Sequence, residues 1–218
     1  MELIICKIVN SEKRMDISML YHASADVKNL TDSSDDLIIR AQSGDDEAFG
    51  LIFERHYRFV YKFIYAMLGD QSAAEELTQE TFLGAYKGIH SLRGEAHLKT
   101  WLCGIAKNVV YKSLRSHRKE GTKSEDAVES LNVFDEKNLS PDKEFLSKEL
   151  NQLIDSALKK LDADKRLVFT LKELQNLSYK EISEITGYSI SKLKTDLHRA
   201  KTEMRSLLRS YREAKNEV

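Results

Sequence analysis

KEISEITGYSISKLKTDLHRAK, residues 180–201, has the pattern of two short helices separated by one glycine. Ser178 can accept a hydrogen bond at the start of the first helix, and Glu181 can bond back to it, which makes a capping box. Gly187 can end that helix because glycine adopts the left-handed conformation without strain, and Ser189 can cap the next helix. Two capped helices joined by a tight turn predict a helix-turn-helix.

The second helix of this pair has one apolar face and one polar, cationic face. The apolar residues at helical spacing are Ile190, Leu193, Leu197, Ala200 and Met204. The opposite face has Ser191, Lys192, Thr195, His198, Arg199 and Thr202, with Lys194 and Lys201 toward one flank and Asp196 and Glu203 toward the other. Such a face is typical of DNA recognition, but an ordinary amphipathic hairpin with a solvated outer face has the same pattern.

The composition predicts an all-helical protein. The chain has 218 residues, of which 32% are charged and 41% hydrophobic, with 9 glycines and a single proline. This length is enough for one or two domains with buried cores, and few helix breakers favour helices throughout. The net charge of −1 argues against a uniformly basic nucleic-acid coat, but not against local basic patches.

Several classes of site are absent from the sequence. Cys6 and Cys103 are the only cysteines, which fits a reducing cytosol, and neither they nor the six histidines have metal-ligand spacing. We find no glycine-rich phosphate loop and no nucleophile–base–acid set, so we expect no cofactor and no enzymatic activity. The apolar run over residues 3–9 is too short for a signal peptide or a membrane span. We therefore expect a cytoplasmic protein with no membrane contact of its own.

Helical periodicity divides the chain into four parts. Residues 1–34 show none and are expected to be a poorly ordered extension. Residues 35–118 predict one helical domain, and residues 148–215 predict a second that ends in the helix-turn-helix. The polar, mostly acidic stretch 119–147 between them is interpreted as a flexible linker.

Within the first domain, the helix ends are marked by capping residues. Asp45 can cap a long helix, and Gly69 interrupts the periodicity. Ser72 and Glu75 are predicted to form a capping box at the start of the next helix. The segment HSLRGEA, residues 90–96, is predicted to be a loop.

Four segments of the sequence resemble the sigma factors of bacterial RNA polymerase. DLIIRAQSGDDEAFGLIFERHY (36–57), AEELTQETFLGAYKGI (74–89) and RGEAHLKTWLCGIAKNVV (93–110) resemble region 2 of the sigma-70 family. LKKLDADKRLVFTLKELQNLSYKEISEITGYSISKLKTDLHRAK (158–201) resembles region 4. Two such domains with only a short linker between them are the arrangement of the extracytoplasmic-function (ECF) group.

The resemblance assigns a role to the acidic helix of the first domain. It implies that this helix docks on the clamp helices of the largest polymerase subunit through Glu75, Glu76, Gln79 and Glu80. An exposed acidic ridge suits a basic, helical partner. Without the resemblance, a solvated helix face would be the simpler interpretation.

The loop HSLRGEA and the basic helix after it correspond to the part that reads and opens the minus-ten promoter element. Family members hold a flipped base of the non-template strand there, which fits cationic side chains that follow phosphates and a pocket for an unstacked base. The implied DNA-binding residues are Arg93, Lys99, Lys107, Asn108, Lys112, Arg115 and Arg118. Trp101 could act as a stacking wedge, but its place in the apolar stripe favours core packing.

The helix-turn-helix corresponds to the reader of the minus-thirty-five element. The implied contacts are Ser191, Lys192, Lys194, Thr195, His198, Arg199 and Lys201. Relatives commonly have threonine near Lys192 and arginine at Asp196, so this chain departs from the family pattern. The carboxylate of Asp196 would repel a phosphate unless it pairs with Lys192 or Arg199, or accepts a hydrogen bond from a cytosine amino group.

The resemblance implies a sigma factor that binds core RNA polymerase, directs it to promoters and helps to melt the DNA. The expected partners are core polymerase, duplex promoter DNA with its melted non-template strand, and an anti-sigma factor. One alternative is a stand-alone helix-turn-helix regulator, which would leave the acidic helix unexplained. Another is a polymerase-binding decoy without promoter use, which the unusual Asp196 keeps open.

Overall fold

The computed structural model describes residues 34–93, 98–120 and 152–216, with the backbone alone for Ser34, 117–120 and 209–216. All regular secondary structure in these ranges is helical, so the predicted all-α fold is confirmed. The expected extension and linker fall almost wholly outside the described residues. At their edges, Ser34 and residues 119–120 belong to helices.

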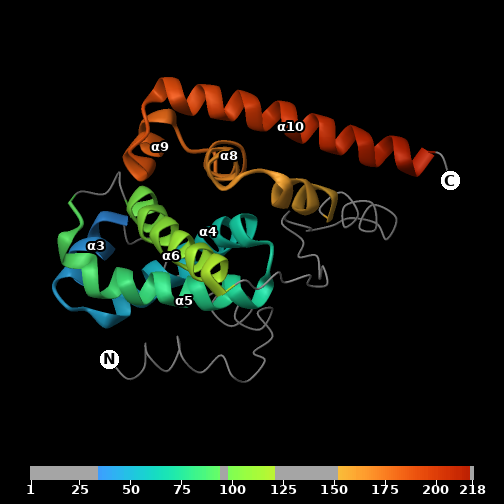
Figure 1. Cartoon of the computed structure of the whole chain (residues 1–218). Helices are drawn as coiled ribbons and strands as arrows, with labels where there is room; N and C mark the ends of the chain where they lie inside the picture. Colours follow the sequence, from blue (N-terminus) through green and yellow to red (C-terminus); the bar gives the residue numbers. More distant parts are fainter. Residues whose placement is uncertain (1–33, 94–97, 121–151, 217–218) are drawn as a thin grey trace, which may run out of the picture.

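The first half of the fold, which we call the N-terminal group, is a bundle of four helices and one short turn (Figure 1). Its elements are α3 (Ser34–Gln42), α4 (Asp46–Leu68), α5 (Gln71–Gly88), the 3₁₀ turn η3 (Ile89–Ser91) and α6 (Leu98–Glu120). Asp45 caps α4 by accepting hydrogen bonds from the amides of Glu47 and Ala48, as predicted. Gly69 ends α4 in the left-handed conformation, with φ of 70°.

The predicted cap of α5 is wrong. Asp70, and not Ser72, is the capping residue, and its Oδ1 accepts a 2.6 Å hydrogen bond from the amide of Ala73. Asp70 has the extended backbone that a cap requires, whereas Ser72 already lies inside the first turn. The helix therefore begins directly after the Gly69 break.

The second half, the C-terminal group, contains a helical stretch over residues 152–160 and the helix-turn-helix. Its further elements are α8 (Ala163–Phe169), a π-helical turn η5 (Thr170–Leu174), α9 (Tyr179–Thr186) and α10 (Ile190–Asn216). The capping box of Ser178 and Glu181 is present, and Gly187 ends α9 with φ of 73°. The amide of Lys192 donates to Oγ of Ser189, so the predicted cap of α10 is confirmed too.

The apolar stripe of α10 is buried over Leu193, Leu197, Ala200 and Met204. Ile190 does not follow the prediction, because its side chain is 45% exposed. As the first residue of α10 it lies at the tip of the turn, ahead of the packed part of the helix.

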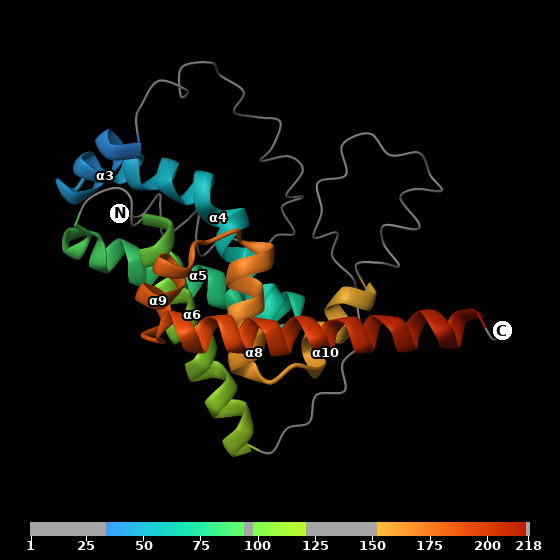
Figure 2. The same cartoon turned by 90° about the horizontal axis from the view of Figure 1, so that it is seen from above.

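The two groups pack directly against each other. One continuous core runs from Leu37 in α3 to Leu197 in α10, and α6 contacts α9 while α4 contacts α8 and η5. In Figures 1 and 2, α10 runs along one side of the molecule, with α8 and α9 between it and the N-terminal group. The sequence predicts two domains but gives no sign of this shared core.

Candidate nucleic-acid interface

The helix-turn-helix presents most of its predicted DNA-binding residues to solvent. The exposed members of that set on α10 are Ser191, Lys192, Lys194, Thr195, His198 and Arg199. Lys201 is half-buried and lies 2.9 Å from the carboxylate of Glu173. Within the described residues neither Arg199 nor Lys194 makes an ion pair, so both exposed cations can meet a phosphate.

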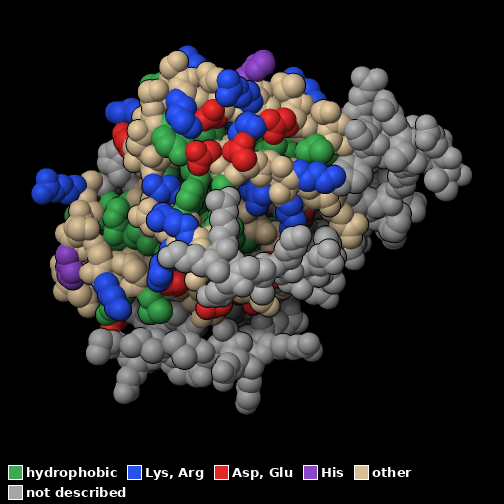
Figure 3. All heavy atoms as spheres, viewed as in Figure 1, with side chains coloured by type: hydrophobic (Ala, Val, Ile, Leu, Met, Phe, Trp, Pro, Cys, Tyr) green, Lys and Arg blue, Asp and Glu red, His purple; other side chains and the backbone are tan. Residues whose placement is uncertain are grey.

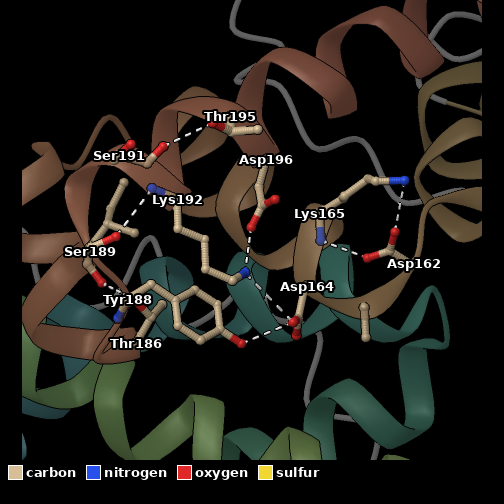
Figure 4. Close-up of polar contacts among 12 residues, drawn as sticks. Asp162, Asp164, Lys165, Thr186, Tyr188, Ser189, Ser191, Lys192, Thr195 and Asp196 are labelled. Atoms are coloured by element: carbon tan, nitrogen blue, oxygen red, sulfur yellow. Dashed lines mark hydrogen bonds and ion pairs between the residues drawn. The ribbon is translucent and has the colours of Figure 1, made fainter.

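Lys192 has a different environment from its neighbours on the helix (Figure 4). Its ammonium pairs with Oδ2 of Asp196, lies 3.7 Å from the ring centre of Tyr188 and is 3.9 Å from Oδ2 of Asp164. The hydrogen bond to Asp196 raises the pKa of Lys192. The side chain is therefore directed toward α8 and held there by two carboxylates and an aromatic face.

This arrangement answers the question that Asp196 raises in the sequence. Its side chain is only 14% exposed, and it pairs with Lys192 one turn earlier. The two charges neutralise each other within the protein. Asp196 therefore does not stand as an isolated negative charge on the outer face of α10.

The outer face of α6 is basic, as the sequence predicts. Lys99, Asn108, Lys112 and Arg115 are exposed, and Arg93 is exposed just after η3. The side chain of Arg118 lies outside the described residues. Lys112 forms an exposed ion pair of 3.3 Å with Glu80 on α5, a contact that contributes little to stability because it is solvated.

Lys107 is the member of this set that the fold withdraws from solvent. Its Nζ donates a 2.8 Å hydrogen bond to the backbone carbonyl of Ile185, at the end of α9. The side chain is half-buried between the two groups of helices. Its ammonium is therefore already engaged by the helix-turn-helix.

A cavity of about 480 Å³ opens beside this helix. Arg93, Trp101 and Asn108 line it from the N-terminal group, and Glu184 and Ile185 line it from α9. Trp101 is half-buried and packs against the core, as its place in the apolar stripe predicts. The cavity has the apolar and polar lining that an unstacked base requires.

Thr100 adds an unpaired polar atom to the cavity wall. Its Oγ1 is buried and has no hydrogen-bond partner in the described parts of the chain. Buried hydroxyl groups are nearly always hydrogen-bonded. The unpaired hydroxyl of Thr100 is therefore an exception within the described residues, and it is buried beneath the cavity surface.

The predicted acidic surface lies on α5. Glu76 and Glu80 are exposed, while Glu75 and Gln79 are half-buried. On the face shown in Figure 3, acidic and basic side chains of the described residues are interspersed rather than separated into one large patch. This mixture agrees with the net charge of −1.

The sequence analysis missed the residue that joins these surfaces, Asp164 at the start of α8. Its Oδ1 accepts a 2.9 Å hydrogen bond from the hydroxyl of Tyr111 on α6, and its Oδ2 accepts a 3.0 Å bond from the hydroxyl of Tyr188. Burial and these hydrogen bonds raise the pKa of both tyrosines. No local pattern could reveal the link, because Tyr111 and Asp164 are 53 residues apart in the chain.

None of the helices in the described ranges is both long enough and apolar enough to cross a membrane. Nor do these ranges contain a group of histidine, cysteine and carboxylate side chains that could hold a metal ion.

Two family descriptions match the chain. Sigma-70 region 2 matches residues 52–120, from within α4 to the end of α6, and Sigma-70, region 4 matches residues 151–204. The ECF RNA polymerase sigma-E factor of Escherichia coli (strain K12) is 33% identical over 181 residues, which cover 80% of this chain and 92% of that protein. The chain belongs to the ECF RNA polymerase sigma factors. The ECF sigma factor SigM of Bacillus subtilis (strain 168) is 34% identical over 156 residues, which cover 72% of this chain and 92% of SigM.

Solved structures share the fold of this sigma factor. CnrH, solved in complex with the cytosolic domain of CnrY, superposes with a TM-score of 0.61 at 20% identity and covers 82% of this chain and 99% of its own. The sigma factor RpoE from Bartonella quintana, solved with the anti-sigma factor NepR, gives a TM-score of 0.60 at 22% identity over 74% and 96% of the two chains. At these identities the likeness shows the fold alone.

Proposed function

We propose that this ECF sigma factor binds core RNA polymerase, directs it to a small set of promoters and assists DNA melting. The proposal rests on two features that this member of the family combines, a basic helix beside a cavity and a capped helix-turn-helix. The basic helix and the cavity suit melted, single-stranded DNA, and the helix-turn-helix suits duplex DNA. The polymerase supplies the chemistry, so the chain itself acts as a specificity factor and not as an enzyme.

The polymerase-binding surface is proposed to be the exposed side of α5, around Glu75, Glu76, Gln79 and Glu80. Glu76 and Glu80 are exposed, and the ion pair of Glu80 with Lys112 is solvated and weak, so both carboxylates can form ion pairs with a basic helical partner. Because such pairs are screened by salt, we expect the affinity for core polymerase to fall as the ionic strength rises.

The minus-ten surface is proposed to be the outer face of α6 together with the cavity. Exposed cations on α6 follow the phosphates of the melted non-template strand, and the cavity holds one unstacked base against Trp101. Asn108 is exposed and lines the cavity, so its amide can bond a base edge.

The minus-thirty-five surface is proposed to be the N-terminal half of α10 in the major groove. Ser191 and Thr195 lie where base edges are approached, while Arg199 and Lys194 suit phosphates. Lys192 does not contact the DNA directly, because its ammonium is turned toward α8. The residues of α10 that contact DNA are therefore fewer than those that the sequence alone suggests.

We further propose that the chain works in the cytoplasm, where it meets the polymerase, and that an anti-sigma factor restrains it. Affinity purification of the tagged chain from uninduced cells tests this second point. Recovery of a small inhibitory protein is expected. Recovery of polymerase subunits without any such protein would contradict it.

Run-off transcription with purified core polymerase tests the proposed function. The template carries the DNA upstream of the gene for this chain. We expect a discrete transcript that is lost on Asn108→Ala, and loss of polymerase binding when Glu76, Gln79 and Glu80 are all changed to alanine. Polymerase binding without any transcript from a library of genomic upstream regions would favour the decoy, and no polymerase binding would favour the stand-alone regulator.

A further inference from the structure

A short segment after α5 forms one wall of the cavity. Ser91, Leu92 and Arg93 line the cavity from this segment, and Arg93 is exposed. Arg93 is also one of the residues that the resemblance assigns to the minus-ten element. The segment has little regular structure of its own, because η3 ends at Ser91 and Leu92 has an extended backbone with ψ of 125°. Its position at the cavity therefore depends on contacts with neighbouring elements.

Gln42, the last residue of α3, holds this segment by two hydrogen bonds. Its Nε2 donates a 3.1 Å bond to the carbonyl of Ile89 and a 2.7 Å bond to the carbonyl of Leu92. A side-chain amide nitrogen carries two donors, so both are used by the two ends of the turn. Ile89 and Leu92 are buried, and buried carbonyl groups that lose their donors cost free energy.

The helix that carries Gln42 is itself anchored to its neighbour. Arg40 of α3 donates to Oδ2 of Asp45 through Nε and Nη2, both at 2.8 Å. The other oxygen of this carboxylate caps α4 by accepting from the amides of Glu47 and Ala48. The bond from Ala48, followed by that from Arg40, lowers the pKa of Asp45. Asp45 therefore ties the end of α3 to the start of α4, and Gln42 acts from a fixed element.

Apolar packing brings α3 and η3 together but does not orient them. The two elements are in direct contact (Figure 1). Leu37, Ile38 and Ala41 of α3 belong to the same core as Ile89 and Leu92. Burial of apolar surface is not directional, whereas hydrogen bonds require a defined distance and angle. The two hydrogen bonds are therefore the contacts that can fix the direction in which the segment leaves the core.

We propose that Gln42 is a positioning residue for the minus-ten surface, which acts through the carbonyls of Ile89 and Leu92 to place Arg93 against the melted strand. The inference rests on the proposed function and deepens it. Gln42 does not contact the DNA, because both hydrogens of its amide are bound to the protein. It lies in α3, which neither the sequence analysis nor the proposed function connects with DNA.

The size of the effect follows from the ordering of the segment before DNA binds. While Gln42 holds the two carbonyls, the backbone that carries Arg93 is already in place. Without these bonds, the strand has to order that backbone as it binds, which lowers its affinity. The net contribution of two such hydrogen bonds corresponds to about a tenfold change in an equilibrium constant.

The experiment measures the affinity of the holoenzyme, formed from the full chain and core polymerase, for a single-stranded DNA. The probe is a fluorescent oligonucleotide with the non-template sequence just upstream of the start site that run-off transcription defines. Gln42→Met keeps the length of the side chain without its donors, and it is expected to weaken binding about tenfold. Gln175→Met is the matched control, because Gln175 also donates to a backbone carbonyl, that of Phe59, which does not line the cavity. It should bind like the parent chain.

A double-mutant cycle separates positioning from a general loss of structure. In a chain with Arg93→Ala, Gln42→Met is expected to weaken binding by about twofold or less, because the residue that it positions is already absent. In a chain with Asn108→Ala it should still weaken binding about tenfold, because Asn108 lies on α6 and is not held by Gln42. A structural defect would instead lower the affinity equally in both backgrounds. Equal effects in the two backgrounds would therefore overturn the proposal.

A second variant covers the case in which Gln42→Met does not fold. Gln42→Asn keeps the amide but is shorter by one methylene, so its nitrogen no longer reaches both carbonyls, and we expect the same pattern in the cycle. Parent-like binding by the folded variants would overturn the positioning role and leave the proposed function standing. Failure of the parent holoenzyme to bind the strand would overturn the proposed function together with the inference that rests on it.

Discussion

His56 is predicted to make the stability of the fold sensitive to mild acid. It lies on α4, half-buried, and its Nδ1 has no hydrogen-bond partner in the described parts of the chain. Burial, together with the nearby charges of Lys99 and Arg55, lowers the pKa of His56 from 6.5 to about 4. The folded state therefore favours the neutral imidazole over the protonated one.

The sign and size of the effect follow from this difference. The unfolded chain binds a proton at His56 below pH 6.5, whereas the folded chain binds one only below about pH 4. The contribution of the neutral imidazole to the free energy of unfolding is therefore complete above pH 6.5, and it is lost as the pH falls from 6.5 to about 4. At pH 5 the loss from this residue is about 2 kcal/mol relative to pH 7.5. A loss of that size is a large part of the stability of an ordinary domain.

Urea denaturation followed by circular dichroism, at pH 7.5 and pH 5, tests this prediction. His56→Leu is expected to remove about 2 kcal/mol of the difference in unfolding free energy between the two pH values. His90→Gln is the control, since His90 is exposed and its replacement should leave the difference intact. The reasoning is refuted if His56→Leu keeps the full pH dependence of the parent chain.

Two further predictions concern the helix-turn-helix. Gly187→Ala forces an alanine to adopt φ of 73° and is expected to cost about 1 kcal/mol of stability in urea denaturation; an unchanged midpoint would contradict the left-handed cap. For duplex DNA bound by the holoenzyme, Arg199→Met is expected to reduce the slope of log K against log salt concentration by about 0.9. The double change Lys192→Met and Asp196→Leu should leave this slope unaltered, because the two charges neutralise each other within the protein. Equal slope changes in titrations of binding against salt would show that Lys192 does contact phosphate.

Local signals in the sequence were sufficient where the structure depends on residues a few positions apart. The capping box at Ser178 and the left-handed glycine at Gly187 were predictable because each is complete within one turn of helix. The same reasoning failed at α5, where Asp70 and Ser72 are both suitable caps and the end of α4 at Gly69 selects the first. The position of the preceding helix is information that the capping rule does not contain.

The orientation of side chains at the candidate site depended on residues far apart in the chain. A helical wheel places Lys192 on the outer, polar face of α10, but its ammonium lies toward α8, beside Asp164 and Tyr188. Lys107 appears equally basic in the sequence and is held by a carbonyl 78 residues away. The packing of the two groups was unpredictable for the same reason, since its contacts join elements that have no local relation.

Footprinting of the upstream DNA with core polymerase, combined with permanganate probing of unpaired thymines, tests the central claim most directly. The account predicts protection that depends on both the chain and the polymerase, in two segments centred about 25 base pairs apart, with reactive thymines in the segment nearer the transcription start. Protection of a palindromic site by the chain alone, with no unpaired thymines when polymerase is added, would contradict it.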